Sequence, residues 1–95
     1  MTPFLSIPEP VKRAALELIT AGAREVYIFG SAARGRKQPG SDVDMAVSGL
    51  PPERFFRAMA NAHGMLDCEL DLVDLDERTP FTEYLKKKGG LIRVA

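Results

Sequence analysis

Two carboxylates and a glycine-serine pair are the residues of this sequence best suited to chemistry. Gly30-Ser31 ends one apolar run, and Asp42-Val43-Asp44 begins another after ten intervening residues. Residues two apart on a β-strand point to the same face, so the carboxylates of Asp42 and Asp44 are expected to converge on one small volume. Carboxylates this close repel each other unless a cation lies between them. Oxygen ligands of this kind suit Mg²⁺, which shares its coordination shell with waters and substrate phosphates.

The glycine-serine pair supplies the other half of the predicted site. Glycine permits close approach of the backbone, and the N–H groups at the start of a helix form an anion-binding end. A phosphate cradle beside metal-binding carboxylates indicates phosphoryl or nucleotidyl transfer.

The surrounding sequence predicts strands that alternate with helices, and therefore an α/β or α+β fold in which helices pack on a sheet. Strands are expected at residues 24–29, 42–48, 69–75 and 91–94. Helices are expected between Pro8 and Gly22 and at residues 31–37, 51–63 and 80–88. The third of these helices is expected to turn four apolar residues toward the core, namely Phe55, Phe56, Met59 and Ala60.

The string G-S-A-A-R-G, followed by S-D-V-D, resembles the signature of the DNA polymerase beta-like nucleotidyltransferase superfamily. It is most similar to the smallest branch of that superfamily, the minimal nucleotidyltransferases of the HEPN/MNT antitoxin type. A composite motif of this length is much more specific than a single glycine-rich loop. The resemblance implies a nucleotidyltransferase fold, which is a small mixed sheet with helices packed on it.

The resemblance also implies roles for the matching residues. The expected catalytic residues, which would also bind two Mg²⁺ or Mn²⁺ ions, are Asp42, Asp44 and Asp71. The expected phosphate-binding residues are Gly30, Ser31 and Arg34. The last carboxylate of the first set is expected to help deprotonate the acceptor as well.

Two aspartates of the third predicted strand compete for that last position. Strand alternation places Asp71 on one face and Asp74 on the other. An aspartate between two leucines is hard to explain structurally, because aspartate is depleted in strands and costly to bury unpaired. Asp74 lies next to a polar loop, where a solvated carboxylate needs no special explanation. Asp71 is therefore favoured, with Asp74 left open as the alternative.

Composition limits the partners and the compartment. The 95 residues predict one domain, residues 1–95, and they carry thirteen basic and thirteen acidic side chains. Because nucleic-acid binding calls for a basic surplus, nucleic acid is not the expected acceptor. No apolar run approaches the ~18 residues that span a membrane. The N-terminus lacks the features of a signal peptide, so a cytoplasmic protein is expected.

These observations and the resemblance together predict a metal-dependent nucleotidyltransferase that moves AMP from ATP to a hydroxyl. The expected acceptor is a tyrosine of a HEPN-domain toxin, so the protein would be an antitoxin that acts by adenylylation. The alternative is a non-catalytic antitoxin that neutralises a HEPN ribonuclease by binding, and aminoglycoside modification is a weaker third possibility. A chain this small cannot wrap both a nucleotide and an acceptor, so a homo- or hetero-oligomer is expected.

Overall fold

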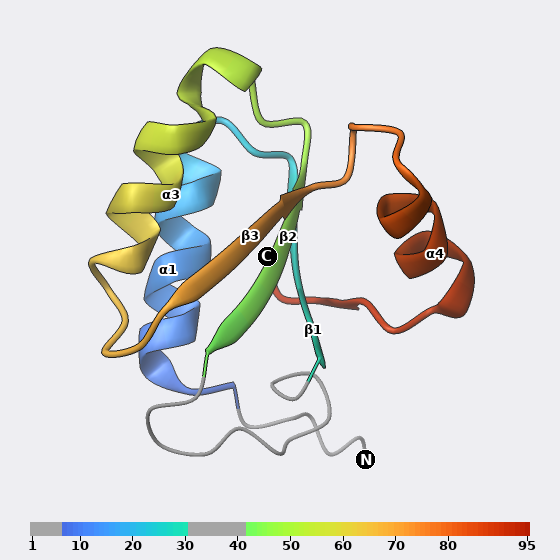
Figure 1. The fold of residues 1–95 in the computed structure, drawn as a ribbon. Helices are drawn as coiled ribbons and strands as arrows, with labels where there is room; N and C mark the ends of the chain where they lie inside the picture. The colour runs from blue at the N-terminus through green and yellow to red at the C-terminus, as the bar shows by residue number, and fades with distance from the viewer. Residues whose placement is uncertain (1–6, 31–41) are drawn as a thin grey trace.

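The computed structural model describes residues 7–30 and 42–95 (Figure 1). Its helices are α1 (Glu9–Thr20), the 3-10 turn η1 (Pro52–Arg54), α3 (Phe55–His63) and α4 (Pro80–Lys88). Its strands are β1 (Glu25–Phe29), β2 (Val43–Ser48), β3 (Leu70–Asp74) and β4 (Ile92–Arg93). Each predicted strand is confirmed to within two residues at either end, and so are the first and last helices. The helix and turn predicted at 31–40 lie outside the described residues.

The strands form one mixed sheet in the order β3-β2-β1-β4. β1 pairs antiparallel with β2 and with β4, whereas β2 and β3 run parallel. Figure 1 views the sheet from its β3 edge, with α1 and α3 on one face and α4 on the other. The predicted fold class, a small mixed sheet with helices packed on it, is confirmed.

The main core lies between the sheet and the helices α1 and α3. Alternate residues of β1 and β2 enter it, because side chains on a strand alternate between the two faces. They meet small and aliphatic residues of the two helices, whose alanines allow close helix packing. The core members that are at most 2% exposed include Val11, Ala14, Leu18, Val26, Ile28, Val43, Met45, Val47, Ala58 and Ala62.

The prediction of which α3 residues face the core was partly wrong. The buried residues of α3 are Ala58 and Ala62, whereas Phe56 is 75% exposed and Ala60 is also exposed. The side of α3 that packs in the main core is centred on two small residues, Ala58 and Ala62, which meet α1 there. Residues two apart on a helix point to nearly opposite sides, so Phe56 and Ala60 face away from that contact. The aromatic side of α3 therefore turns partly outward.

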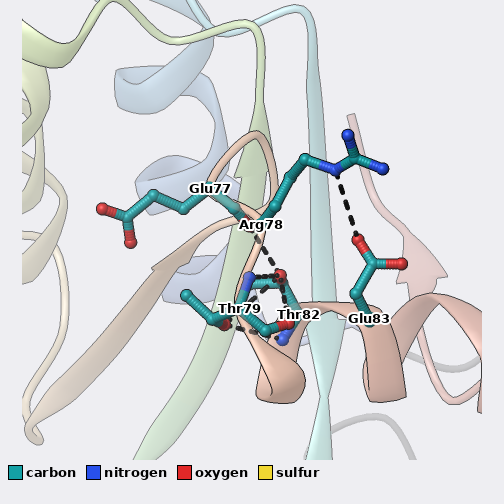
Figure 2. Close-up of polar contacts among 5 residues, drawn as sticks. All are labelled: Glu77, Arg78, Thr79, Thr82 and Glu83. Carbon is teal, nitrogen blue, oxygen red and sulfur yellow. Dashed lines mark hydrogen bonds and ion pairs between the residues drawn. The ribbon is translucent and has the colours of Figure 1, made fainter.

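The second face of the sheet is covered by α4, which is fixed by its N-terminal cap (Figure 2). The Thr82 backbone N–H donates to Thr79 Oγ1 at 3.1 Å, and the Thr79 N–H donates to Thr82 Oγ1 at 3.0 Å. The buried Thr82 hydroxyl also donates to the Glu77 carbonyl at 2.6 Å, which ties the helix to the turn after β3. Pro80 at the first helical position and Gly89 in the left-handed region mark the two ends of α4.

A smaller apolar cluster fills the space under α4. Its buried members are Phe29, Ala46, Leu75 and Leu85. In the two described ranges of the chain, no helix combines the length and apolar character needed to cross a lipid bilayer.

Candidate active site

Strand register brings two of the predicted carboxylates together. Asp44 of β2 is paired with Asp71 of β3, and Phe29 of β1 is the partner of Asp44 on the other side. Paired residues of neighbouring strands lie about 5 Å apart, with side chains on the same face. That face is the one covered by α4, since Val73 and Ala46 of the same alternation belong to its apolar cluster. The end of β1, Asp44 and Asp71 therefore form a row across three adjacent strands.

Gly30 lies at the end of this row, directly after the last residue of β1. Its φ of 70° lies in the left-handed region, and a Cβ built on it would come within 3.0 Å of Asp44 Oδ2. A side chain here is therefore strained by the backbone conformation, and it would also displace the Asp44 carboxylate. The position favours glycine because of its left-handed backbone conformation, which brings the chain close to Asp44.

The electrostatics of Asp44 link all three predicted carboxylates. Partial burial raises the pKa of Asp44 most, and the negative charges of Asp71 and then Asp42 raise it further. A hydrogen bond between the Asp44 and Asp71 carboxyls contributes in the same direction. The cluster therefore favours a proton on Asp44, or a cation in its place.

Asp74 does not join this cluster. It lies three residues further along β3, opposite Val47. Its Oδ1 accepts the Asp76 backbone N–H at 2.9 Å, and the Asp76 carboxylate in turn accepts the Gly49 N–H at 2.7 Å. Asp74 has a structural role in the turn after β3. Of the two competing aspartates, Asp71 is the one beside Asp44, and its catalytic role stays a prediction.

Of the other predicted site residues, the structure describes only Asp42. Asp42 is exposed and lies immediately before β2, while Ser31 and Arg34 lie outside the described residues. Within residues 7–30 and 42–95, no three His, Cys, Asp or Glu side chains lie close enough together to hold a metal ion. The donor set nevertheless fits Mg²⁺, which binds through one or two carboxylates and completes its shell with waters and nucleotide phosphates.

A cavity of about 550 Å³ adjoins Gly30 and was not predicted from the sequence. Phe81, Tyr84 and Lys88 of α4 line it, and Lys88 Nζ lies 5.9 Å from the centre of the Tyr84 ring. Cavities of this volume accommodate small ligands of nucleotide size. Phe81, Tyr84 and Lys88 are spaced three and four residues apart and so share one side of α4, which could have indicated the cavity. The run of lysines at the end of the helix was interpreted instead as a solvated last turn.

Residues 20–93 match the profile of the family described as Polymerase beta, Nucleotidyltransferase. The match runs from the end of α1 to β4 and includes every described carboxylate of the site. The chain therefore belongs to this family of nucleotidyltransferases.

Solved structures place it near the minimal members. One similar structure is a minimal nucleotidyltransferase, with 28% identity, a TM-score of 0.66, and coverage of 85% of this chain and 86% of that one. Another is a toxin-antitoxin crystal structure with AMP-PNP, at 21% identity and a TM-score of 0.68, covering 88% of this chain and 72% of that one. The MntA-HepT toxin-antitoxin structure gives 18% identity and a TM-score of 0.62, with coverage of 93% and 72%. The last two share the fold. Among curated protein sequences, none matches this chain significantly.

Proposed function

We propose that this protein is a metal-dependent adenylyltransferase that moves AMP from ATP to a hydroxyl of a partner protein. The observation that carries the proposal is the Asp44-Asp71 pair, set side by side by strand register and held against Gly30. Membership of the nucleotidyltransferase family supplies the reaction class. The proposal adds to that reaction class the identity of the donor, the metal and the acceptor.

Asp42, Asp44 and Asp71 are the residues that would hold Mg²⁺ or Mn²⁺. The raised pKa of Asp44 supports this assignment, because a metal ion relieves the same repulsion that otherwise favours a proton. When bound, the metal neutralises charge on the phosphates. Gly30 would admit the phosphates close to the backbone, with Ser31 and Arg34 as further contacts.

Asp71 would accept the proton of the acceptor hydroxyl. The acceptor oxygen forms a bond to the α-phosphorus, the bond from that phosphorus to the bridging oxygen breaks, and pyrophosphate leaves. AMP is then joined to the acceptor, and the proton rests on Asp71.

The proposed acceptor is a tyrosine of a HEPN-domain toxin, which would make this chain an antitoxin in the cytoplasm. The toxin-antitoxin structures of similar fold support a partner protein, and AMP-PNP in one of them supports an adenine nucleotide as donor. Complex formation with this partner would also complete a pocket that a chain of this size cannot enclose alone.

Mass spectrometry tests the proposal. The wild type, ATP, Mg²⁺ and a HEPN protein from the same genome should yield a partner heavier by ~329 Da per modified hydroxyl, the AMP increment. Asp71→Asn should abolish the increment. Glu9→Gln is the control, because it removes an exposed carboxylate of α1 that lies neither beside Asp44 nor on β3. Equal loss in both variants, or no increment with wild type, would contradict the proposal.

A binding-only antitoxin is the second candidate. The observation in its favour is the exposure of aromatic side chains beside β3, with Phe56 75% and Phe81 49% exposed. In that case Asp71→Asn should neutralise the toxin as well as wild type does, without any mass increment.

A further inference from the structure

The order of the strands sets the side from which an acceptor must approach. Gly30 follows β1, Asp44 lies on β2 and Asp71 lies on β3, and these are three consecutive strands of the sheet. In-line transfer at the α-phosphorus places the attacking oxygen and the leaving pyrophosphate on opposite sides. If the proposed function holds, and the pyrophosphate lies at Gly30, the acceptor approaches from the β3 edge.

An apolar groove lies along that edge. β3 is the last strand of the sheet, and Figure 1 shows it crossing in front, between α3 and α4. The groove has a volume of about 470 Å³ and is lined by residues of η1, α3, β3 and α4. It includes Val73, which shares the face of Asp71 two residues further along the strand, a distance of about 7 Å. A segment bound in the groove can therefore reach Asp71.

The walls of the groove expose aromatic rings. Phe56 of α3 is 75% exposed and Phe81 of α4 is 49% exposed, while Phe55 packs edge-to-face against Phe56 at 5.5 Å between ring centres. Large apolar side chains gathered around a hollow are typical of surfaces that bind another protein.

The same groove is acidic. The segment 67–77, which contains β3, carries six acidic residues and no basic one. Asp74 and Glu77 of this segment line the groove. Arg78 pairs instead with Glu83, at 4.0 Å, and Figure 2 shows the Glu77 side chain pointing away from that pair. Across the described part of the chain, no ion pair joins Asp74 or Glu77 to a basic side chain.

We propose that this groove docks the acceptor protein through a segment in which basic side chains alternate with apolar ones, and so delivers the hydroxyl to Asp71. The apolar residues contact Phe56 and Phe81, and the basic residues meet Asp74 and Glu77. Charge selects this occupant over a second copy of the chain, because two acidic β3 edges repel each other. The inference rests on the proposed function for the chemistry, whereas docking itself is measurable without it.

Fluorescence anisotropy with two labelled peptides tests the docking surface. Each peptide carries one tyrosine among leucines, with arginines in the first and glutamates in the second. Wild type should bind the arginine peptide at least about tenfold more tightly than the glutamate peptide. Phe56→Ser and Glu77→Lys should each weaken binding of the arginine peptide by about tenfold or more.

Matched controls separate the groove from general surface effects. Leu16→Ser removes another exposed apolar side chain, because Leu16 of α1 is 61% exposed against 75% for Phe56 and lies outside the groove. Glu9→Lys makes the same charge change on α1. Both should bind like wild type, and thermal unfolding should show that the four variants are folded.

Three outcomes would overturn the inference: equal affinity for both peptides, equal effects of groove and control variants, or a wild-type dimer in light scattering that Phe56→Ser dissociates. Failure of the proposed function has a different signature. The arginine peptide would bind in the groove, with the variant pattern above, yet gain no AMP with ATP and Mg²⁺.

Discussion

The two faces of the sheet differ in what their residues accomplish. The face under α1 and α3 carries only apolar side chains from β1 and β2, and these are almost completely buried. The face under α4 combines a smaller apolar cluster with Asp44, Asp71 and the close passage of Gly30. The first face stabilises the fold, whereas the second holds carboxylates that repel each other. Substitutions on the first face should therefore change mainly the free energy of unfolding, and those on the second face mainly the response to ligands.

The largest effect on stability is expected on the first face. Leu18→Ala removes a side chain that is fully buried between α1 and the sheet, and should lower the free energy of unfolding by about 2–5 kcal/mol. Leu16→Ala on the same helix should change it by less than about 0.5 kcal/mol, since Leu16 is 61% exposed. Urea unfolding measures both. Comparable losses would show that α1 packs through a different side.

Gly30→Ala should give the next largest effect and act on the second face. Gly89 provides a matched control, because its φ of 69° is within one degree of that of Gly30 at 70°, while nothing lies within 4 Å of an added Cβ. Gly89→Ala should cost only the backbone strain, about 1 kcal/mol. Gly30→Ala should cost about 1–2 kcal/mol more, because it also displaces Asp44. If denaturant unfolding shows equal costs, the close contact with Asp44 is absent.

Metal binding should stabilise the protein through the carboxylates of the second face alone. Mg²⁺ at about 100 times its dissociation constant should stabilise wild type by roughly 2.7 kcal/mol, since only the folded cluster binds it. Asp44→Asn should abolish this increase and should leave the Tm of the metal-free protein equal or higher, because it removes a like charge. Thermal unfolding with and without Mg²⁺ gives the comparison. An equal response in wild type and variant would remove Asp44 from the metal site.

The smallest effect is a pH dependence. The raised pKa of Asp44 means that the folded protein holds this proton at a pH where the unfolded chain has released it. The contribution of Asp44 to the stability of the metal-free protein should therefore fall as pH rises from about 3.9 through the raised pKa, and then stay level. Comparing unfolding of wild type and Asp44→Asn across this window isolates the contribution. A difference that grows in the opposite direction would mean that Asp44 is stabilised in its charged form.

Much of the fold was predictable because local signals agreed. The helix at 80–88 was predicted with the limits that it has, and Pro80 at its first position and Gly89 after its last are local signals that mark the ends of helices. The face of α3 was not, because its core contact is made by the small residues Ala58 and Ala62, and the spacing of the larger apolar side chains does not reveal it.

The site was predictable in its residue types and less so in its arrangement. The Gly30-Ser31 and Asp42-Asp44 spacing lies within one short segment, so sequence indicates it directly. The proximity of Asp71 depends on strand register, which long-range packing sets. The groove beside β3 combines residues of η1, α3, β3 and α4, and no local pattern brings such distant segments together.

The parallel pairing of β2 and β3 makes the carboxylate pair depend on a long-range contact. Neighbouring antiparallel strands can be joined by a tight turn, but a parallel pair needs a crossover, here supplied by α3. Asp44 and Asp71 therefore meet only after this long loop has closed, and closing it costs entropy before any pairing is gained. A chain folded only through α1, β1 and β2 has no such pair. Metal binding at this cluster would consequently report the pairing of β2 with β3, and could be used to follow that step of folding.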